Sequence, residues 1–151
     1  MTDRGVAKLI YSSKKEPAQY QSSGYILVNS KFEQKYPEVV QRVVNVLVKQ
    51  AAWDSNPANK TELFKIWSKS GLSYNTFVRA NDGVDLKRHS APILDAFNVA
   101  VIKKKLKAGQ DLKLIRGNID VDSWIEPKYV NNAVKTLNLQ NYWKPLNANG
   151  Q

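Results

Sequence analysis

The stretch Ser23–Asn56, SGYILVNSKFEQKYPEVVQRVVNVLVKQAAWDSN, is the part of the sequence around which the rest of the chain is organised. It opens with Tyr25–Val28, an apolar run that is too short for a helix and rich in β-forming residues, which predicts a strand. Ser30 and Glu33 have the spacing of a capping box. A short helix is therefore predicted to begin at Ser30 and to run to Tyr36.

A second, longer helix is predicted to begin at Pro37, because proline at the first helical position loses no needed hydrogen bond. Its polar residues fall on one stripe, and most of the other positions are valine or leucine. β-branched residues are unfavourable in a helix unless tertiary burial compensates for them. We therefore expect this helix to form the core of its lobe, through Val39, Val40, Val43, Val44, Leu47, Val48 and Ala51.

The rest of the chain predicts one more strand, Val6–Tyr11, and a series of helices. One helix follows the cap-like pair Asn59 and Glu62 and ends at Gly71. A shorter one is capped by Ser73. The later helices are predicted as Ser90–Ala108 with Gly109 as C-cap, a turn capped by Asp122, and Pro127–Asn138. The fold class is thus α/β, helix-rich, with few strands of its own.

Two strands cannot form a stable sheet alone, because an isolated ribbon is marginal and its edges leave backbone groups unpaired. The short loop Ser12–Ser22 allows a hairpin but no parallel crossover. We therefore expect the strands to belong to a larger sheet, either in a longer protein or in an association such as a homodimer.

The composition is that of a soluble globular protein, with 42% hydrophobic and 24% charged residues and a formal net charge of +10. Cysteine is absent, which excludes disulfides and thiolate catalysis within this chain. The N-terminal sequence lacks the layout of a signal peptide. The charge invites a nucleic-acid or anionic-membrane hypothesis.

No residue pattern indicates an enzyme. His89 is the only histidine, so a histidine pair for zinc is excluded, and it is expected at the exposed entry of a helix. Asp120 and Asp122 lack the surrounding glycine-containing loop of a calcium site. We expect no catalytic residue, no metal and no cofactor.

A basic helical nucleic-acid-associated protein is the alternative, and it rests on charge alone. The cations are spread over nearly every segment, and the aromatic residues mostly occupy positions predicted to be buried. No nucleic acid is therefore expected as a partner.

Two phrases of the sequence resemble one family. Phe32–Val40, FEQKYPEVV, lies between a strand ending in VNS and a long apolar helix ending at Trp53; Ile119–Val130, IDVDSWIEPKYV, precedes Ala133–Leu139. Both resemble the C-terminal half of substrate-binding proteins of ABC transporters, in the branch for aliphatic sulfonates, taurine and nitrate, which also includes binders of thiamine pyrimidine precursors.

The resemblance implies a non-enzymatic, two-lobed binding protein that closes over a small organic solute and delivers it to a membrane permease. It implies residues 1–29 as strands and hinge from the end of the second lobe, 30–139 as the helical closing part of the first, and 140–151 as a weakly structured tail. The full-length protein would be periplasmic or otherwise extracytoplasmic, although this chain carries no signal peptide. An enzyme of pyrimidine-precursor synthesis with this fold would need a catalytic histidine or metal cluster.

The resemblance also implies which loops approach the solute. One holds the candidate ligand-binding residues Tyr20, Ser22, Ser23 and Gly24, and the other holds Arg79, Asn81 and Asp82. The serines could donate hydrogen bonds to an anionic oxygen, and an arginine can pair bidentately with a sulfonate or carboxylate. The carboxylates of Asp82 and Asp85 keep an uncharged or cationic solute open.

Overall fold

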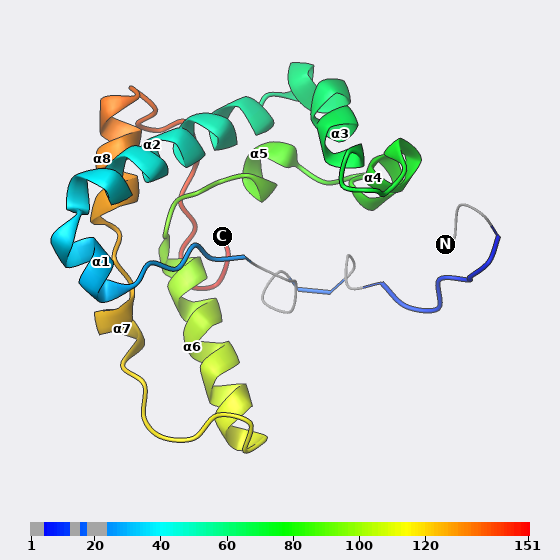
Figure 1. The fold of residues 1–151 in the computed structure, drawn as a ribbon. Coiled ribbons are helices and arrows are strands. Elements are labelled where there is room, and N and C mark those ends of the chain that lie inside the picture. The colour runs from blue at the N-terminus through cyan, green and yellow to red at the C-terminus, as the bar shows by residue number, and fades with distance from the viewer. Residues whose placement is uncertain (1–4, 13–15, 18–23) are drawn as a thin grey trace. The chain divides into compact units, whose positions relative to one another are not determined.

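A computed structural model describes residues 5–12, 16–17 and 24–151 (Figure 1). Over these residues the chain is helical and contains no strand. The elements are α1 (Ser30–Lys35), α2 (Pro37–Asp54), the 3₁₀ turn η4 (Pro57–Asn59), α3 (Lys60–Ser68), α4 (Tyr74–Ala80), α5 (Leu86–His89), α6 (Ala96–Asp111), α7 (Val121–Trp124) and α8 (Lys128–Thr136).

The helix-rich part of the predicted fold is confirmed, whereas the strands are absent from the described residues. Val6–Tyr11 and Tyr25–Val28 have no regular secondary structure, and Ile10 and Ile26 are 94% and 75% exposed. A strand exists only when a neighbour completes its hydrogen-bond ladder. β-forming residues alone therefore did not make these segments strands.

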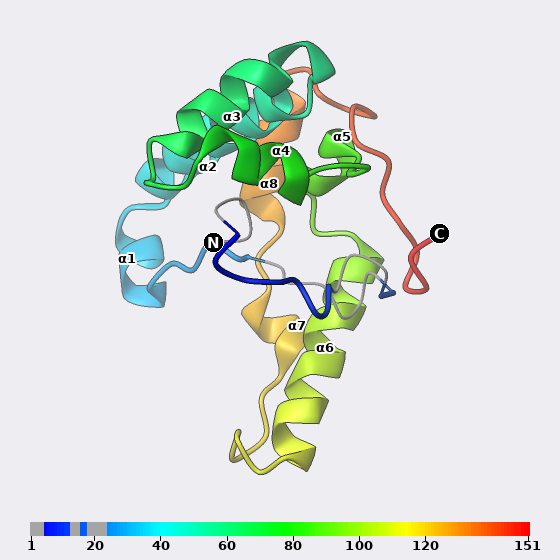
Figure 2. The ribbon, with the colours of Figure 1, turned by 90° about the vertical axis from the view of Figure 1, so that its right-hand side faces the viewer.

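The chain divides into two compact units, and the first comprises Met1–Ile26 and Gln50–Ala91. Its core is formed by residues of α3 and α5, with aromatic rings of α2, α3 and α4 packed around them: Leu63, Phe64 and Leu86, then Trp53, Trp67 and Phe77. α3 and α4 lie side by side in Figures 1 and 2. Leu63 and Phe64 of α3 are buried in this unit, Trp67 is partly buried, and Ile66 is 43% exposed.

The second unit comprises Leu27–Lys49 and Pro92–Gln151. Side-chain contacts join its helices: Gln41 of α2 donates to the Tyr129 carbonyl of α8 at 2.9 Å, and Lys103 of α6 pairs with Asp122 of α7 at 2.7 Å. Figure 2 shows α7 beside α6. The buried residues of this unit are Val40, Val48, Asp95, Val101, Val121, Tyr129, Val130, Ala133 and Trp143.

Helix α2 begins at Pro37 as predicted, but its expected role as a core helix is wrong. Only Val40 and Val48 are buried, while Val43 is 52% exposed and Leu47 is 39% exposed. Gln41, which lies on the same side of the helix as the buried Val48, contacts α8. An apolar stripe shows which face of a helix could be buried, and it does not supply the surface that buries it.

Several helix ends differ from the prediction because a neighbouring side chain reaches the free backbone amides better. Asn29, one residue before Ser30, caps α1, and Asp120 caps α7 in place of Asp122. Asn59 makes no capping bond to α3 and donates to the Trp53 carbonyl at 2.9 Å. Ser73 caps α4 as predicted.

Helix α6 begins six residues later than predicted, at Ala96, because the Asp95 carboxylate accepts from the Asn98 amide at 2.9 Å. Pro92 also disfavours a helical conformation for the residue before it. Gly109 is inside this helix and not its C-cap; a methyl group there would lie 2.7 Å from Ile115 Cδ1. The glycine leaves room for Ile115 to fold back on the helix.

Candidate functional site

The first predicted ligand-binding segment is described only at its end. Tyr20, Ser22 and Ser23 lie outside the described residues. Gly24 is exposed, and an added Cβ would have no atom within 4 Å. The backbone at Gly24 is therefore accessible to a small molecule.

The second predicted segment lies at the carboxyl end of α4. Arg79 is in the last turn and is exposed, and Asp82 follows just beyond the helix and is exposed too. Arg79 and Asp82 each also interact with other residues of the chain. Asn81 is only 7% exposed, and its Nδ2 donates to the Phe77 carbonyl at 2.9 Å. Asn81 therefore closes the helix end, and Arg79 and Asp82 present charge to solvent.

Two neighbouring charged residues belong to α5. The Asp85 carboxylate accepts from the amides of Lys87 at 2.9 Å and Arg88 at 3.3 Å, so it caps this short helix. His89 is the last residue of α5 and is exposed. The prediction that His89 stands at the entry of a helix is thus wrong, because Asp85 begins a helix that the sequence pattern did not predict.

A polar cluster in the second unit joins α1 to α8. Glu33 Oε1 accepts from Lys128 Nζ at 2.8 Å and from the Tyr129 hydroxyl at 3.0 Å, and Glu126 Oε2 accepts from Lys128 Nζ at 2.9 Å. The ammonium also lies 4.7 Å from the Tyr129 ring centroid. All four side chains are engaged with one another, which is the arrangement of a structural clamp.

The electrostatics of this cluster follow from its hydrogen bonds. The bond from Lys128, and then the bond from Tyr129, hold the pKa of Glu33 below its ordinary value. The hydrogen bonds that the Lys128 ammonium donates to Glu33 and Glu126 raise the pKa of Lys128. Sequence reasoning missed the cluster, because Glu33 was assigned to a capping box and no local pattern links residues so distant in the chain.

Asp95 is a second group that the sequence did not single out. Its carboxylate is 7% exposed and accepts from the Asn98 amide at 2.9 Å, the Asn98 Nδ2 at 2.8 Å and the Leu146 amide at 2.9 Å. Trp143, three residues before Leu146, is 4% exposed. Asp95 therefore attaches the C-terminal residues to the start of α6.

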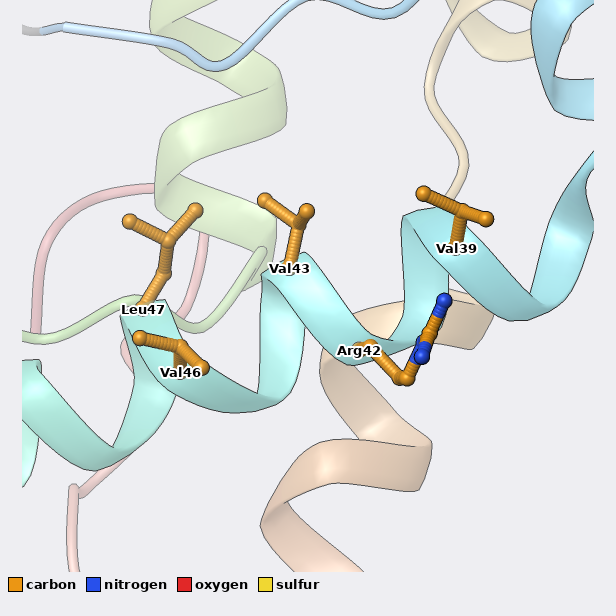
Figure 3. Close-up of a pocket in the computed structure, with 5 residues that line it drawn as sticks. All are labelled: Val39, Arg42, Val43, Val46 and Leu47. Carbon is orange, nitrogen blue, oxygen red and sulfur yellow. The ribbon is translucent and has the colours of Figure 1, made fainter.

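An open, shallow hollow of ≈ 410 Å³ lies on α2 and is lined by Val39, Arg42, Val43, Val46 and Leu47. Figure 3 shows these side chains along the length of the helix. Apart from Arg42, every lining residue is aliphatic. The hollow offers no hydrogen-bond donors beyond that arginine, so it fits an apolar surface better than a polar solute.

Neither a metal centre nor a membrane span is found in the part of the chain that the structure describes. No group of three or more His, Asp or Glu side chains there could hold a metal ion. No helix among these residues is long and apolar enough to cross a membrane.

Comparisons with known proteins give one solved structure. It is described as the periplasmic sulfonate-binding protein SsuA of a sulfonate ABC transporter from Methylobacillus flagellatus KT; the identity is 26%, the TM-score is 0.84, and the match covers 97% of this chain and 45% of that chain. No protein-family profile matches the chain, and no curated protein matches it. The chain thus spans less than half the length of its structural neighbour and shares the structure of part of a periplasmic binding protein.

Proposed function

We propose that this chain is part of the solute-binding component of an ABC importer and contributes contacts to a small organic solute. The observation that carries the proposal is the structural match over 97% of the chain to a protein described as sulfonate-binding. The two sequence phrases that resemble substrate-binding proteins support it independently. Solute release to a membrane permease and a periplasmic location belong to the same proposal.

The solute-contacting residues in this proposal are Gly24, Arg79 and Asp82, together with Tyr20, Ser22 and Ser23. Arg79 would supply a bidentate donor for a sulfonate, nitrate or carboxylate oxygen. Asn81 contributes by holding the end of α4, where its amide bonds to the Phe77 carbonyl, rather than by direct contact.

The segment carries charges of both signs, from Arg79 and from the carboxylates of Asp82 and Asp85, and all three residues are exposed. Asp85 also accepts from two backbone amides of α5. A zwitterion such as taurine could use both, with its sulfonate on Arg79 and its ammonium on Asp82. The lobe boundaries at residues 29 and 139 and the choice among solutes stay predictions.

Calorimetric titration of the chain with taurine, an alkanesulfonate, nitrate and an aminopyrimidine tests the proposal. We expect saturable binding of a sulfonate that is weakened by Arg79→Met and unchanged by Arg116→Met, a matched change at an exposed arginine of the second unit. If none of the four solutes binds, or if both variants weaken binding equally, the proposal is wrong.

The same protein preparation distinguishes the proposed function from the nucleic-acid alternative. That alternative predicts retention on DNA at physiological salt which falls steeply as salt rises, because released counterions drive such binding. The proposed function predicts little retention at physiological salt, despite the net charge of +10.

A further inference from the structure

We propose that the turn at the carboxyl end of α6 binds the surface of an anionic lipid bilayer. The residues concerned are Leu112–Arg116, with the sequence LKLIR, which follow α6 directly and are called the α6 tip below. The inference is independent of the proposed function, since none of these residues belongs to the proposed solute site.

The α6 tip is held in place by backbone hydrogen bonds to the last turns of α6. The amides of Leu114 and Ile115 both donate to the Gly109 carbonyl, at 2.8 and 3.1 Å. Lys113 has a φ of 58°, in the left-handed region that commonly ends a helix and reverses the chain. Ile115 is thereby brought against Gly109, where an added Cβ would lie 2.7 Å from Ile115 Cδ1. The tip is therefore a folded turn with a defined shape.

This turn leaves two leucines open to solvent. Leu112 is 70% exposed and Leu114 is 77% exposed, whereas Ile115 is 37% exposed. In Figures 1 and 2 the end of α6 extends beyond α7 and lies away from α8. A flat apolar layer that approaches this end of the second unit can therefore bury both leucines, and burial of apolar area is the main source of affinity for such a layer.

Cations alternate with the leucines in the α6 tip. Lys113 and Arg116 are exposed, and neither forms an ion pair with any residue that the structure describes. The acidic neighbours are engaged elsewhere, since Asp111 pairs with Lys107 at 2.9 Å and the Asp120 carboxylate caps α7. The tip therefore presents positive charge together with its apolar side chains.

This alternation favours a lipid surface over a protein partner. Long basic side chains lie along apolar surface while their charged ends reach the level of the phosphates, so leucine and lysine neighbours can both be satisfied at a bilayer. A folded protein would need an apolar pocket for each leucine and an acidic group between them. Anionic headgroups supply negative charge at every position, and the net charge of +10 adds to the attraction.

Co-sedimentation of the full 151-residue chain with lipid vesicles measures the binding. At physiological salt we expect binding to vesicles of equal parts phosphatidylglycerol and phosphatidylcholine, and binding weaker by about tenfold or more to phosphatidylcholine alone. The double variant Leu112→Ser with Leu114→Ser should weaken binding to the anionic vesicles by about tenfold or more. The matched control is Ile26→Ser with Leu27→Ser, at side chains that are 75% and 70% exposed, and it should leave binding unchanged.

Charge removal tests the electrostatic part of the proposal. Lys113→Gln with Arg116→Gln should weaken binding to the anionic vesicles about twentyfold, because each basic residue at such a surface contributes about fivefold. Lys69→Gln with Arg42→Gln removes the same charge at exposed residues outside the tip, where salt screens the attraction, and should weaken binding by about twofold or less. Equal losses in the two double variants would overturn the proposal, because net charge alone would then govern binding.

A fluorescent label tests insertion directly. Because the chain has no cysteine, Leu114→Cys can carry an environment-sensitive fluorophore at a single position. Its emission should shift to the blue when anionic vesicles are added, whereas the same label at Leu27→Cys should not respond. Equal shifts at both positions, or unchanged vesicle binding by the double leucine variant, would overturn the proposal. Absence of binding to the anionic vesicles would overturn it too and leave the α6 tip to an acidic protein partner.

Discussion

The apolar side chains of the α3–α5 cluster are buried, whereas part of the apolar surface of α2 is exposed. Leu63 and Phe64 are each 1% exposed, and the rings of Trp67 and Phe77 pack beside them at 5.6 Å between centroids. Val43 and Val46 of α2 are 52% and 67% exposed. The difference is that the cluster finds its partners within about forty residues of chain, whereas Val43 and Val46 stay largely exposed among the described residues. The cluster therefore shows how an apolar stripe is buried when its covering elements lie nearby in the chain.

The largest expected effect is in the cluster. Phe64→Ala should lower the free energy of unfolding by about 3–5 kcal/mol, because it leaves a cavity among packed rings. Val43→Ala should change it by less than about 0.5 kcal/mol, as expected for an exposed position. Chemical denaturation of both variants at low protein concentration measures this difference. Similar losses in the two variants would show that α2 is as well buried as the cluster.

The clamp between α1 and α8 should give an acid-dependent effect. The folded-state pKa of Glu33 lies below its ordinary value of 4.5, so its stabilisation is present at neutral pH and is lost as the pH falls through the folded-state pKa. Glu33→Gln should therefore lower the melting temperature at neutral pH and have no effect well below pH 4.5.

Asp111→Asn is the control for this clamp, because Asp111 pairs with Lys107 at 2.9 Å on the surface. The two side chains are 60% and 74% exposed, respectively. Such surface pairs contribute little. A larger loss for Asp111→Asn than for Glu33→Gln would contradict the clamp.

A smaller effect is expected at the start of α4, where the Ser73 hydroxyl accepts from the Thr76 amide at 3.2 Å. Ser73→Ala should cost about 1 kcal/mol of stability, and Ser73→Asp should restore the cap. Thermal unfolding followed by circular dichroism measures both. Equal stability of Ser73→Ala and the wild type would mean that the cap contributes nothing to the first unit.

The smallest effect should come from Val46→Ser, at a 67% exposed position of α2. The exposed valine loses little on substitution, so the free energy of unfolding should stay within about 0.5 kcal/mol of the wild type. A larger loss in denaturant titrations would indicate that Val46 is covered within a single copy.

The sequence predicted the presence of helices better than it predicted the contacts that cap, cover or pair the elements. Pro37 and Ser73 began helices as expected because proline geometry and a serine cap act within one turn. Asn29 caps α1 in place of Ser30, and Asp95 caps α6 later in the chain than predicted, because several acceptors competed for the same amides. The strands failed for a different reason, since strand pairing needs a partner that no local pattern supplies.

The candidate solute site stays a prediction, and the structure gives only the setting of its described residues. Residues Gly24, Arg79 and Asp82 are exposed as a ligand site requires, whereas Asn81 is committed to the Phe77 carbonyl. This hydrogen bond from Asn81 depends on the backbone geometry at the end of α4. The Glu33–Lys128–Tyr129 contacts join residues from opposite ends of the chain, so only the folded structure identifies them.

The measurement that tests the solute-binding account most directly is a residue-resolved amide titration of the chain by NMR with taurine. The account predicts saturable shifts concentrated at Gly24 and at Arg79–Asp82, and their loss in Arg79→Met. Shifts confined to the second unit, or no shifts at solute concentrations far above those at which binding proteins saturate, would contradict it.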